Sequence, residues 1–352
     1  MTPADRRPYT VITPVPRRTW EEAVRDDPLA LPTQTPQWAD AVRATRGYRD
    51  ASRLYVWPDG TRLVLPMVRR SPLPAPLAQH LSWPLDFGLG GVLAPDGEVT
   101  PAQAGAVITD LARRSLRPTY LRPSPLADRV WLDCAPPGVT RRPRVTQILD
   151  LSGGFEDVWR NRFRGAVRNQ VRQGERAGLD VERDSTGRLV PVLYGLYQMS
   201  VQRWARQSGE SPRAARRAAE RKDPYRKFDA VARNLAGNCH VWVASYQGAP
   251  AAAIMVLRQG EHAVYWRSAM DKELTRRTRA VHLLMSRAIQ DACTSGARYF
   301  HLCDDHPGSS VEAFKASFGP QRYHTAGLWL ARSGLRDALP RARTTRSASP
   351  TA

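Results

Sequence analysis

The residue that most clearly offers chemistry is Lys315, which lies in the segment Phe314 to Gly319, Phe-Lys-Ala-Ser-Phe-Gly. It is one of only four lysines in a chain that has 49 arginines. A lysine ammonium can stabilise the oxyanion that forms when an amine attacks an activated ester. The alternative is an exposed lysine at the start of a helix. The rarity of lysine in this chain and the position of Lys315 between Phe314 and Phe318 favour a functional role for this segment.

A second polar group follows an expected strand at 298–302, where residues 301–306 read His-Leu-Cys-Asp-Asp-His. Metal sites rarely have this spacing, and a cysteine nucleophile needs a base that the local sequence does not supply. We therefore predict no metal site. Asp304 or Asp305, at the end of the strand, could accept a proton from an attacking amine or hold its ammonium form.

The charge of the chain is extreme, with a formal net charge of +20 and a pI of about 10.7. Such an excess of basic side chains favours a polyanionic partner, such as nucleic acid, a phosphorylated substrate or anionic lipid. A genome that prefers arginine codons would exchange lysine for arginine and would leave the total unchanged. For any single arginine, a solvated helical face is the simpler interpretation. As a surface for the phosphates of a nucleic acid or of a phosphorylated acceptor we predict Arg164, Arg168, Arg172, Arg216, Arg217, Arg276, Arg277 and Arg279.

Two halves of the chain show a similar order of helix, hairpin, helix and strand. In the first half we expect a helix at 35–45, strands at 52–57 and 62–68, a helix from Thr100 and a strand at 119–122. In the second we expect a strand at 147–151, helices at 155–176, 190–204 and 228–235, strands at 240–246, 251–258 and 262–268, a helix at 280–293 and a strand at 298–302. This order predicts an α+β fold with a mixed sheet and flanking helices. We place one domain at 1–143, a second at 144–331, and a disordered basic tail at 332–352.

Composition limits the class of protein further. A hydrophobic fraction of 42% over 352 residues fits two packed domains. No apolar run approaches the roughly 20 residues that cross a membrane, and the first nine residues have no apolar core of the signal-peptide kind. The four cysteines are far apart and show neither disulfide nor metal-ligand spacing. We therefore expect a cytoplasmic protein without membrane insertion.

Several segments of the second half resemble the C-terminal domain of the FemABX family, the aminoacyl-tRNA-dependent peptidyl transferases built from two GNAT-like acyltransferase domains in tandem. The resembling segments are 265–271 (Tyr-Trp-Arg-Ser-Ala-Met-Asp), the helix at 281–293, 296–302 (Gly-Ala-Arg-Tyr-Phe-His-Leu) and 314–319. The basic helix at 164–176 and the motif at 34–38 (Gln-Thr-Pro-Gln-Trp) are also similar. The resemblance implies two GNAT-like domains, of which the first is degenerate.

The resemblance also implies roles for individual residues. Phe314 and Lys315 would position the ester end of a charged tRNA, and Trp266 and Arg267 would line the same cleft, although core packing is as good an explanation for Trp266. Trp38 falls in the family's short motif. Arg213 aligns with the grip on a diphosphate-bearing acceptor, but the segment lengths differ there.

The phosphate-binding loop of GNAT enzymes is rich in glycine, because its backbone N–H groups hold the CoA pyrophosphate at a helix N-terminus. The matching segment here, 275–280, reads Thr-Arg-Arg-Thr-Arg-Ala and contains no glycine. This argues against CoA, and we predict no bound cofactor, with aminoacyl-tRNA as a co-substrate.

Our leading hypothesis is an aminoacyltransferase that forms an amide between an amino acid from aminoacyl-tRNA and an amine of a small peptide-like acceptor. The acceptor would be a natural-product intermediate or a peptidoglycan precursor. The alternatives are an acyl-CoA-dependent GNAT N-acyltransferase and a non-catalytic RNA-binding protein. The family resemblance favours a monomer.

Overall fold

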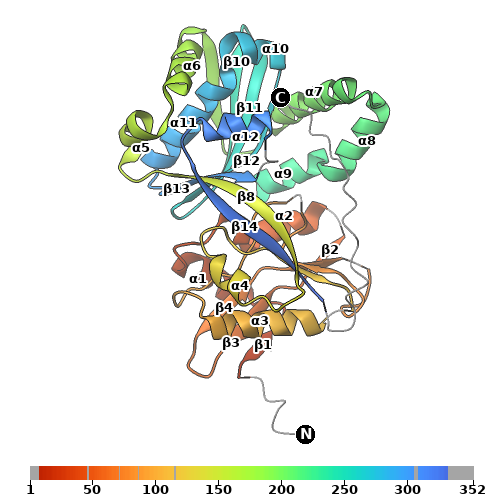
Figure 1. Ribbon diagram of the computed structural model, residues 1–352. Coiled ribbons are helices and arrows are strands. Elements are labelled where there is room, and N and C mark those ends of the chain that lie inside the picture. Colours follow the sequence, from red (N-terminus) through yellow and green to blue (C-terminus); the bar gives the residue numbers. More distant parts are fainter. Residues whose placement is uncertain are drawn as a thin grey trace. The chain divides into compact units, whose positions relative to one another are not determined.

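The computed structural model describes residues 8–45, 47–70, 72–85, 87–114, 116–304 and 308–331. These residues form two compact units, 8–144 with 324–331 and 145–323 (Figure 1). The predicted tail at 332–352 and Asp305 lie outside the described residues. The predicted α+β class, with mixed sheets and flanking helices, is confirmed.

The first unit has two groups of strands with helices packed on them. Strands β1, β3 and β4 pair antiparallel, whereas the order β2-β5-β6-β7-β14 contains one parallel pair, β6 with β7. The elements are β1 (Thr10–Ile12), α1 (Arg17–Asp26), the 3-10 turn η2 (Pro32–Gln34), α2 (Pro36–Thr45), β2 (Tyr48–Asp50), β3 (Arg53–Val56), β4 (Arg62–Leu65), β5 (Val68–Arg70), β6 (His80–Leu81), α3 (Pro101–Arg114), β7 (Thr119–Leu121), α4 (Arg129–Asp133) and β14 (Gln321–Leu330).

The core of the first unit forms where the apolar face of α3 meets the strands. Val107, Ile108 and Leu111 recur at helical spacing and pack in one buried cluster with Leu121 of β7 and Leu328 of β14. The sequence pattern predicts that residues 324–331 belong to the second domain. In the structure they belong to the first unit, where Leu328 of β14 pairs with Leu121 of β7.

The second unit is built on the strand order β8-β13-β12-β11-β10-β9. Its elements are β8 (Thr140–Asp150), α5 (Gly154–Asp157), the π-helical turn η3 (Val158–Arg162), α6 (Gly165–Arg176), β9 (Leu179–Asp184), α7 (Val190–Ser208), α8 (Pro212–Lys222), α9 (Tyr225–Asn234), β10 (Cys239–Tyr246), β11 (Ala249–Gln259), β12 (His262–Met270), α10 (Lys272–Thr278), α11 (Ala280–Thr294), β13 (Tyr299–Asp304) and α12 (Ser310–Ala316). Helices α5, α6 and α11 cover one face of this sheet, and α7 and α9 pack on the other (Figure 1).

One predicted element differs in the structure, because the expected helix at 155–176 is broken. Helix α5 runs into the π-helical turn η3, and the chain is then extended at Phe163 and Arg164 before α6 begins. Apolar residues continue at helical spacing through the break, since Val158, Phe163 and Val167 all lie in the same buried cluster. Periodicity alone therefore predicted one continuous helix.

Candidate active site

The two strands that open the candidate site are β12 and β13. They pair in parallel through three residue pairs only, from His262–Tyr299 to Val264–His301. β12 then runs on to Met270, whereas β13 shifts register against β8 between His301 and Cys303. Cys303 adopts a φ of +62°, a conformation that non-glycine residues seldom take outside functional sites. The pairing of β12 with β13 thus ends where both strands become irregular.

Lys315 lies in the last turn of α12, and its side chain is buried, with 5% of the residue exposed. Its ammonium nitrogen is 5.8 Å from the centre of the Tyr265 ring, which comes directly after the paired part of β12. A cation over an aromatic face is attracted by the ring quadrupole. Of the four lysines, Lys227 and Lys315 are buried, and Lys222 and Lys272 are exposed. The structure therefore does not support the interpretation of Lys315 as an exposed surface lysine.

Local hydrogen bonds fix the helix that carries Lys315. The Ser309 hydroxyl accepts a hydrogen bond from the Glu312 N–H at 3.1 Å and so caps the helix N-terminus. The Glu312 carboxylate in turn accepts from the N–H of Gly308 at 2.6 Å and pairs with Arg322 at 3.0 Å. Reciprocal capping of this kind holds a short helix that could not persist on its own.

The rest of the motif anchors α12 on the break between η3 and α6. The buried ring of Phe318 meets Phe163 edge-on, with ring centroids 5.1 Å apart. The N–H of Arg164 donates to the carbonyl of Ser317 at 3.1 Å. Gly319 has a φ of +77°, and a Cβ there would lie 2.1 Å from the Arg162 carbonyl oxygen. The break that the sequence did not indicate is thus the surface on which the motif docks.

Phe314 packs against the start of α11. Its ring is 5.0 Å from the His282 ring and 5.3 Å from the Phe318 ring, both in edge contacts. It is only partly buried against the core of the second unit. Phe314 therefore lies between the structural part of the motif and the side of α12 that carries Lys315.

Asp304 ends β13, as the sequence predicted for the residue after the expected strand. Its carboxylate accepts a hydrogen bond from the Thr146 hydroxyl of β8 at 2.6 Å, and the side chain is half-buried. Asp305, the other candidate, lies outside the described residues. Asp304 is thus held at the edge of the strand that opens the site.

A buried charged cluster stands beside Trp266 on the other face of the sheet. The Asp223 carboxylate accepts from Lys227 at 2.7 Å and from Arg267 at 3.0 Å, and Arg267 stacks 4.6 Å from the Trp266 ring centre. Burial would raise the pKa of Asp223, but the charges of Arg267 and Lys227 outweigh it and hold the pKa well below its usual range. The sequence analysis named Arg267 and Trp266 as candidate residues of the site, but it did not name Asp223 or Lys227. The rarity of lysine is the one sequence signal that pointed to Lys227.

A pair of buried histidines connects β12 and β13 where they still pair. His262 Nδ1 and His301 Nε2 are 2.9 Å apart, and His262 stacks on Tyr299. Burial, and then the neighbouring His262, lower the pKa of His301 well below its usual value. The His301 imidazole is therefore neutral at pH 7, and the histidine pair joins the two strands just before they diverge.

His282 predicts a pH dependence of stability. Burial, with a smaller effect of Arg279, lowers its pKa to about 4. Between pH 6.5 and 4 the unfolded chain binds more protons than the folded one, so the free energy of unfolding falls as the pH falls. From pH 7 to pH 5 we expect a loss of about 2 kcal/mol from His282. Urea titrations at both pH values measure it.

The control for this prediction is a histidine outside the core. His282→Phe, which keeps a ring between Phe314 and Phe318, should show a smaller loss on acidification than the wild type. His324→Gln, at an exposed position of β14, should keep the wild-type loss. An equal loss in all three proteins would contradict the assignment to His282.

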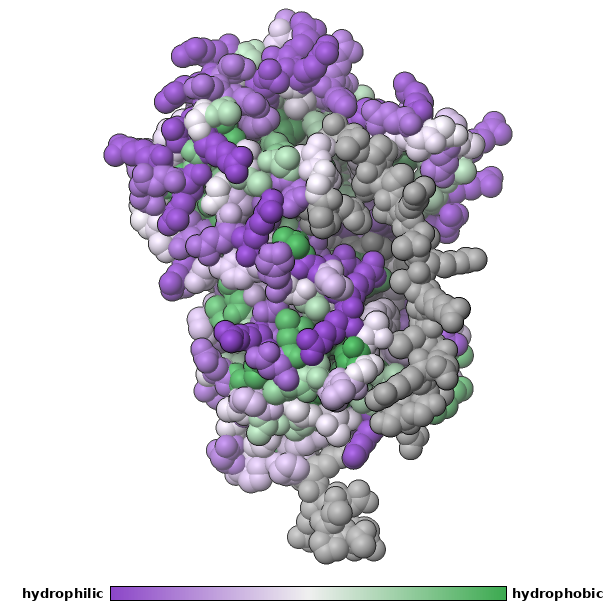
Figure 2. Space-filling view, viewed as in Figure 1, coloured by the Kyte–Doolittle hydropathy of each residue, from purple (hydrophilic) through white to green (hydrophobic). Residues whose placement is uncertain are grey.

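The predicted tRNA-binding arginines divide into two groups. Arg168 donates to the carbonyls of Phe163, Arg160 and Trp159 at 2.6, 3.1 and 3.2 Å, so it satisfies the main chain at the helix break. Arg279 is half-buried and donates to Gln173 at 3.2 Å. The exposed ones are Arg164, Arg172, Arg216, Arg217, Arg276 and Arg277. Arg213, which was predicted to bind the acceptor, is also exposed. Hydrophilic side chains dominate the surface of α6, α8 and α10 (Figure 2).

Arg168→Ala should lower the free energy of unfolding by about 2 kcal/mol, because three main-chain carbonyls lose a charged donor. Arg172→Ala, one turn later on the same helix, removes only an exposed guanidinium 5.8 Å from the Trp159 ring and should cost about 0.5 kcal/mol. Denaturant unfolding of the two variants measures the difference. Equal losses would show that Arg168 is a surface residue like Arg172.

Trp38 is completely buried on α2, where it meets Phe87 edge-on with centroids 6.4 Å apart. The structure therefore places it in the core of the first unit and gives its ring no exposed surface for a substrate. Gln34, in the same motif, has a structural role as well. Its side-chain oxygen accepts a hydrogen bond from the N–H of Leu31, and its main-chain carbonyl accepts one from the indole N–H of Trp20.

The segment between β12 and α11 forms a helix. α10 is capped by the Asp271 carboxylate, which accepts from the N–H groups of Glu273 and Leu274. It ends at Arg279, whose φ is +57° and whose carbonyl accepts from His282 and Leu283 in the first turn of α11. Gly174 of α6 packs closely here, since a Cβ on it would lie 3.4 Å from the Thr278 oxygen.

Residues 161–316, which include Tyr265 and Lys315, match the family model of the acetyltransferase (GNAT) domain. They form a GNAT-like acyltransferase domain. No curated protein matches the chain. Among solved structures, the crystal structure of FemX is similar, with a TM-score of 0.64 at 12% identity over 94% of this chain and 99% of that one. These likenesses show the fold.

Two further structures share this fold. A protein of unknown function from Bacteroides thetaiotaomicron has a TM-score of 0.54 at 10% identity, over 92% of this chain and 99% of that one. The C-terminal domain of a putative lysylphosphatidylglycerol synthetase from Agrobacterium fabrum has a TM-score of 0.51 at 15% identity, over 91% and 94%.

Within the part of the chain that the structure describes, no helix has the length and apolar character needed to span a membrane. The same residues contain no cluster of three or more histidine, cysteine or acidic side chains able to hold a metal ion.

Proposed function

We propose that this GNAT-like acyltransferase moves an amino acid from aminoacyl-tRNA to an amine of a small peptide-like acceptor in the cytoplasm, as members of the FemABX family do. The acceptor is a natural-product intermediate or a peptidoglycan precursor. The observation that carries the proposal is the buried Lys315, held by the capped helix α12 and directed at Tyr265 where β12 leaves β13.

The chemistry follows from the groups at this point. The acceptor amine attacks the ester carbonyl, its electron pair forms the new C–N bond, and the carbonyl oxygen becomes an oxyanion. The Lys315 ammonium stabilises that charge in a largely buried setting, where a fixed charge is more effective than in water. The amine proton passes to Asp304 or to the substrate, and the tRNA 3′ oxygen leaves with the electrons of the broken C–O bond.

The choice of tRNA as donor rests on two further features. The segment 275–280 corresponds to the one that GNAT enzymes use to bind CoA pyrophosphate. It lies in α10 and at its junction with α11 and contains no glycine, and the amides of Glu273 and Leu274 just before it are occupied by Asp271. Exposed arginines on α6, α8 and α10 supply charge for a polyanion. The name of one similar structure, a putative lysylphosphatidylglycerol synthetase, also describes an aminoacylated product.

An acyl-CoA-dependent N-acyltransferase is the second candidate, because the matching family model describes an acetyltransferase domain. The deciding experiment incubates the protein with a charged tRNA pool and candidate amines, with and without ribonuclease, and in parallel with acetyl-CoA. Amide formation that ribonuclease abolishes is the expected result. Turnover with acetyl-CoA alone would replace the proposal with the second candidate, and tight tRNA binding without any transfer would indicate a non-catalytic RNA-binding protein.

A further inference from the structure

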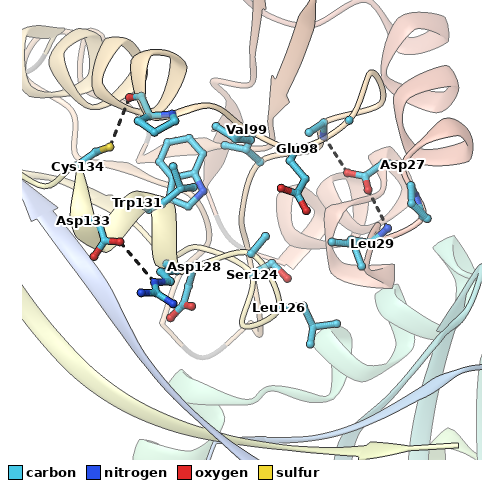
Figure 3. A pocket seen from close by; sticks show the side chains of 18 residues that line it. Asp27, Leu29, Glu98, Val99, Ser124, Leu126, Asp128, Trp131, Asp133 and Cys134 are labelled. Carbon is cyan, nitrogen blue, oxygen red and sulfur yellow. Dashed lines mark hydrogen bonds and ion pairs between the residues drawn. The ribbon is translucent and has the colours of Figure 1, made fainter. Parts of the chain in front are cut away.

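The first unit contains a cavity of about 820 Å³ that the proposed reaction does not use (Figure 3). It lies between the segment 92–99, the loop 124–128 and helix α4, and Trp131 and Leu126 are among its apolar lining residues. A volume of this size fits a small organic ligand.

Two backbone segments approach each other closely next to Val92 and Ser124, which line the cavity. Gly91 has a φ of +121°, and a Cβ on it would lie 2.7 Å from the Ser124 nitrogen. Gly90 is tight as well, since its Cβ would lie 3.2 Å from the Arg122 oxygen. The glycines of this segment therefore serve packing inside the first unit, and not the binding of phosphate.

The charge of the lining is opposite to that of the chain. Four acidic side chains and one arginine line the cavity, namely Asp27, Glu98, Asp128, Asp133 and Arg129, in a chain of net charge +20. Two of the acids already have partners. Asp27 accepts from the N–H groups of Leu29 and Ala94, both at 2.8 Å, and Asp133 pairs with Arg129 at 3.7 Å.

Two polar atoms in the lining lack a hydrogen-bond partner among the described residues, and both are shielded from solvent. They are the hydroxyl of Ser124, a residue only 4% exposed, and Oδ2 of Asp128. Figure 3 shows the Ser124 side chain between those of Asp128, Glu98 and Leu126. Burial, and then the nearby Asp133, raise the pKa of Asp128. Buried polar groups of this kind ordinarily bind a partner.

An anionic ligand is disfavoured at the adjoining start of α3. The N–H of Gln103 donates to the Thr100 hydroxyl at 3.3 Å, and the Gln103 side chain accepts from the N–H of Thr100 at 2.9 Å. This reciprocal cap occupies donors that a phosphate or carboxylate would need. The acidic lining adds electrostatic repulsion.

We propose that the cavity binds an organic amine in its ammonium form, with the cation at Asp128 and Ser124 and the apolar part against Trp131 and Leu126. An ammonium donates to both orphaned oxygen atoms and neutralises the carboxylate, which no neutral or anionic ligand can do. The proposal concerns the first unit and does not depend on which acyl donor the second unit uses.

Ligand-observed NMR titrations of the full chain with three probes of similar shape test the charge preference. The probes are phenethylamine, 2-phenylethanol and 3-phenylpropionate. Phenethylamine should bind about tenfold more tightly than the alcohol, and the carboxylate most weakly. Equal binding of the three probes, or binding of none, would overturn the proposal.

Variants locate the site. Asp128→Asn should weaken phenethylamine binding about tenfold and leave the alcohol unchanged, and Ser124→Ala should reduce amine binding less. Glu21→Gln, an exposed position of α1 outside the cavity, should bind as the wild type. Thermal melting verifies that each variant is folded. An amine preference that survives both cavity substitutions would place the cation elsewhere and refute the proposal.

Discussion

Replacing Lys315 with methionine should lower the rate of acyl transfer by about 10²- to 10³-fold, the usual cost of removing one preorganised donor to an oxyanion. Methionine keeps an unbranched apolar stem in the buried position and removes the charge over Tyr265. The loss should appear in kcat, because the oxyanion exists only in the transition state and the intermediate. Single-turnover kinetics with aminoacyl-tRNA, and with acetyl-CoA in parallel, measure it.

Two comparisons make this result specific. Lys272→Met changes an exposed lysine of the second unit and should leave the rate as in the wild type. Filter binding of charged tRNA to Lys315→Met should match the wild type, because the arginine surfaces are intact. A rate near that of the wild type would remove Lys315 from the chemistry, whichever donor proves correct.

The sequence predicted the local elements of the second unit well because their signals are local. The helix at 280–293 follows from Val281, Leu284 and Ala288 at helical spacing, and these residues are buried on α11. The hairpin strands 240–246 and 251–258 follow from turn residues and β-branched or apolar runs, and they correspond to β10 and β11.

What the sequence could not show are contacts between distant residues. Arg267 donates a hydrogen bond to Asp223, which lies 44 residues earlier in the chain, and the local sequence of neither segment predicts this contact. The docking of Gly319 on Arg162 joins the segment after α12 to η3, and the apolar periodicity that runs through the break did not indicate it. Trp38 shows a related limit, because the motif at 34–38 does not reveal that its ring is buried in the core of the first unit.

These non-local contacts also explain how the segment 314–319 holds Lys315, for which we propose a role in the chemistry. Lys315 can be held close to Tyr265 only if the short helix α12 is fixed at both ends. Ser309 and Glu312 fix its start, and Phe318 and Gly319 fix its end on the helix break. The break is in turn held by Arg168, whose guanidinium satisfies the carbonyls that the π-helical turn leaves open. Under the proposed function, stability and catalysis are therefore coupled through the same segment.

Gly319→Ala should be the most destabilising single methyl addition in this segment, with a loss of about 3 kcal/mol or more in the free energy of unfolding. The added Cβ would lie 2.1 Å from the Arg162 oxygen and 2.7 Å from its carbonyl carbon. Both are backbone atoms, so α12 and the helix break must move apart. Chemical denaturation measures the loss, and transfer activity should fall with it because Lys315 moves with α12.

Gly308 supplies the matched control, because its φ is also +77° and a Cβ there meets nothing within 4 Å. Gly308→Ala therefore reports only the cost of placing a side chain at positive φ, about 1–2 kcal/mol. The difference between the two variants isolates the contact with Arg162. If both lose the same stability, the glycine serves backbone conformation alone, and α12 is not anchored on the helix break through Gly319.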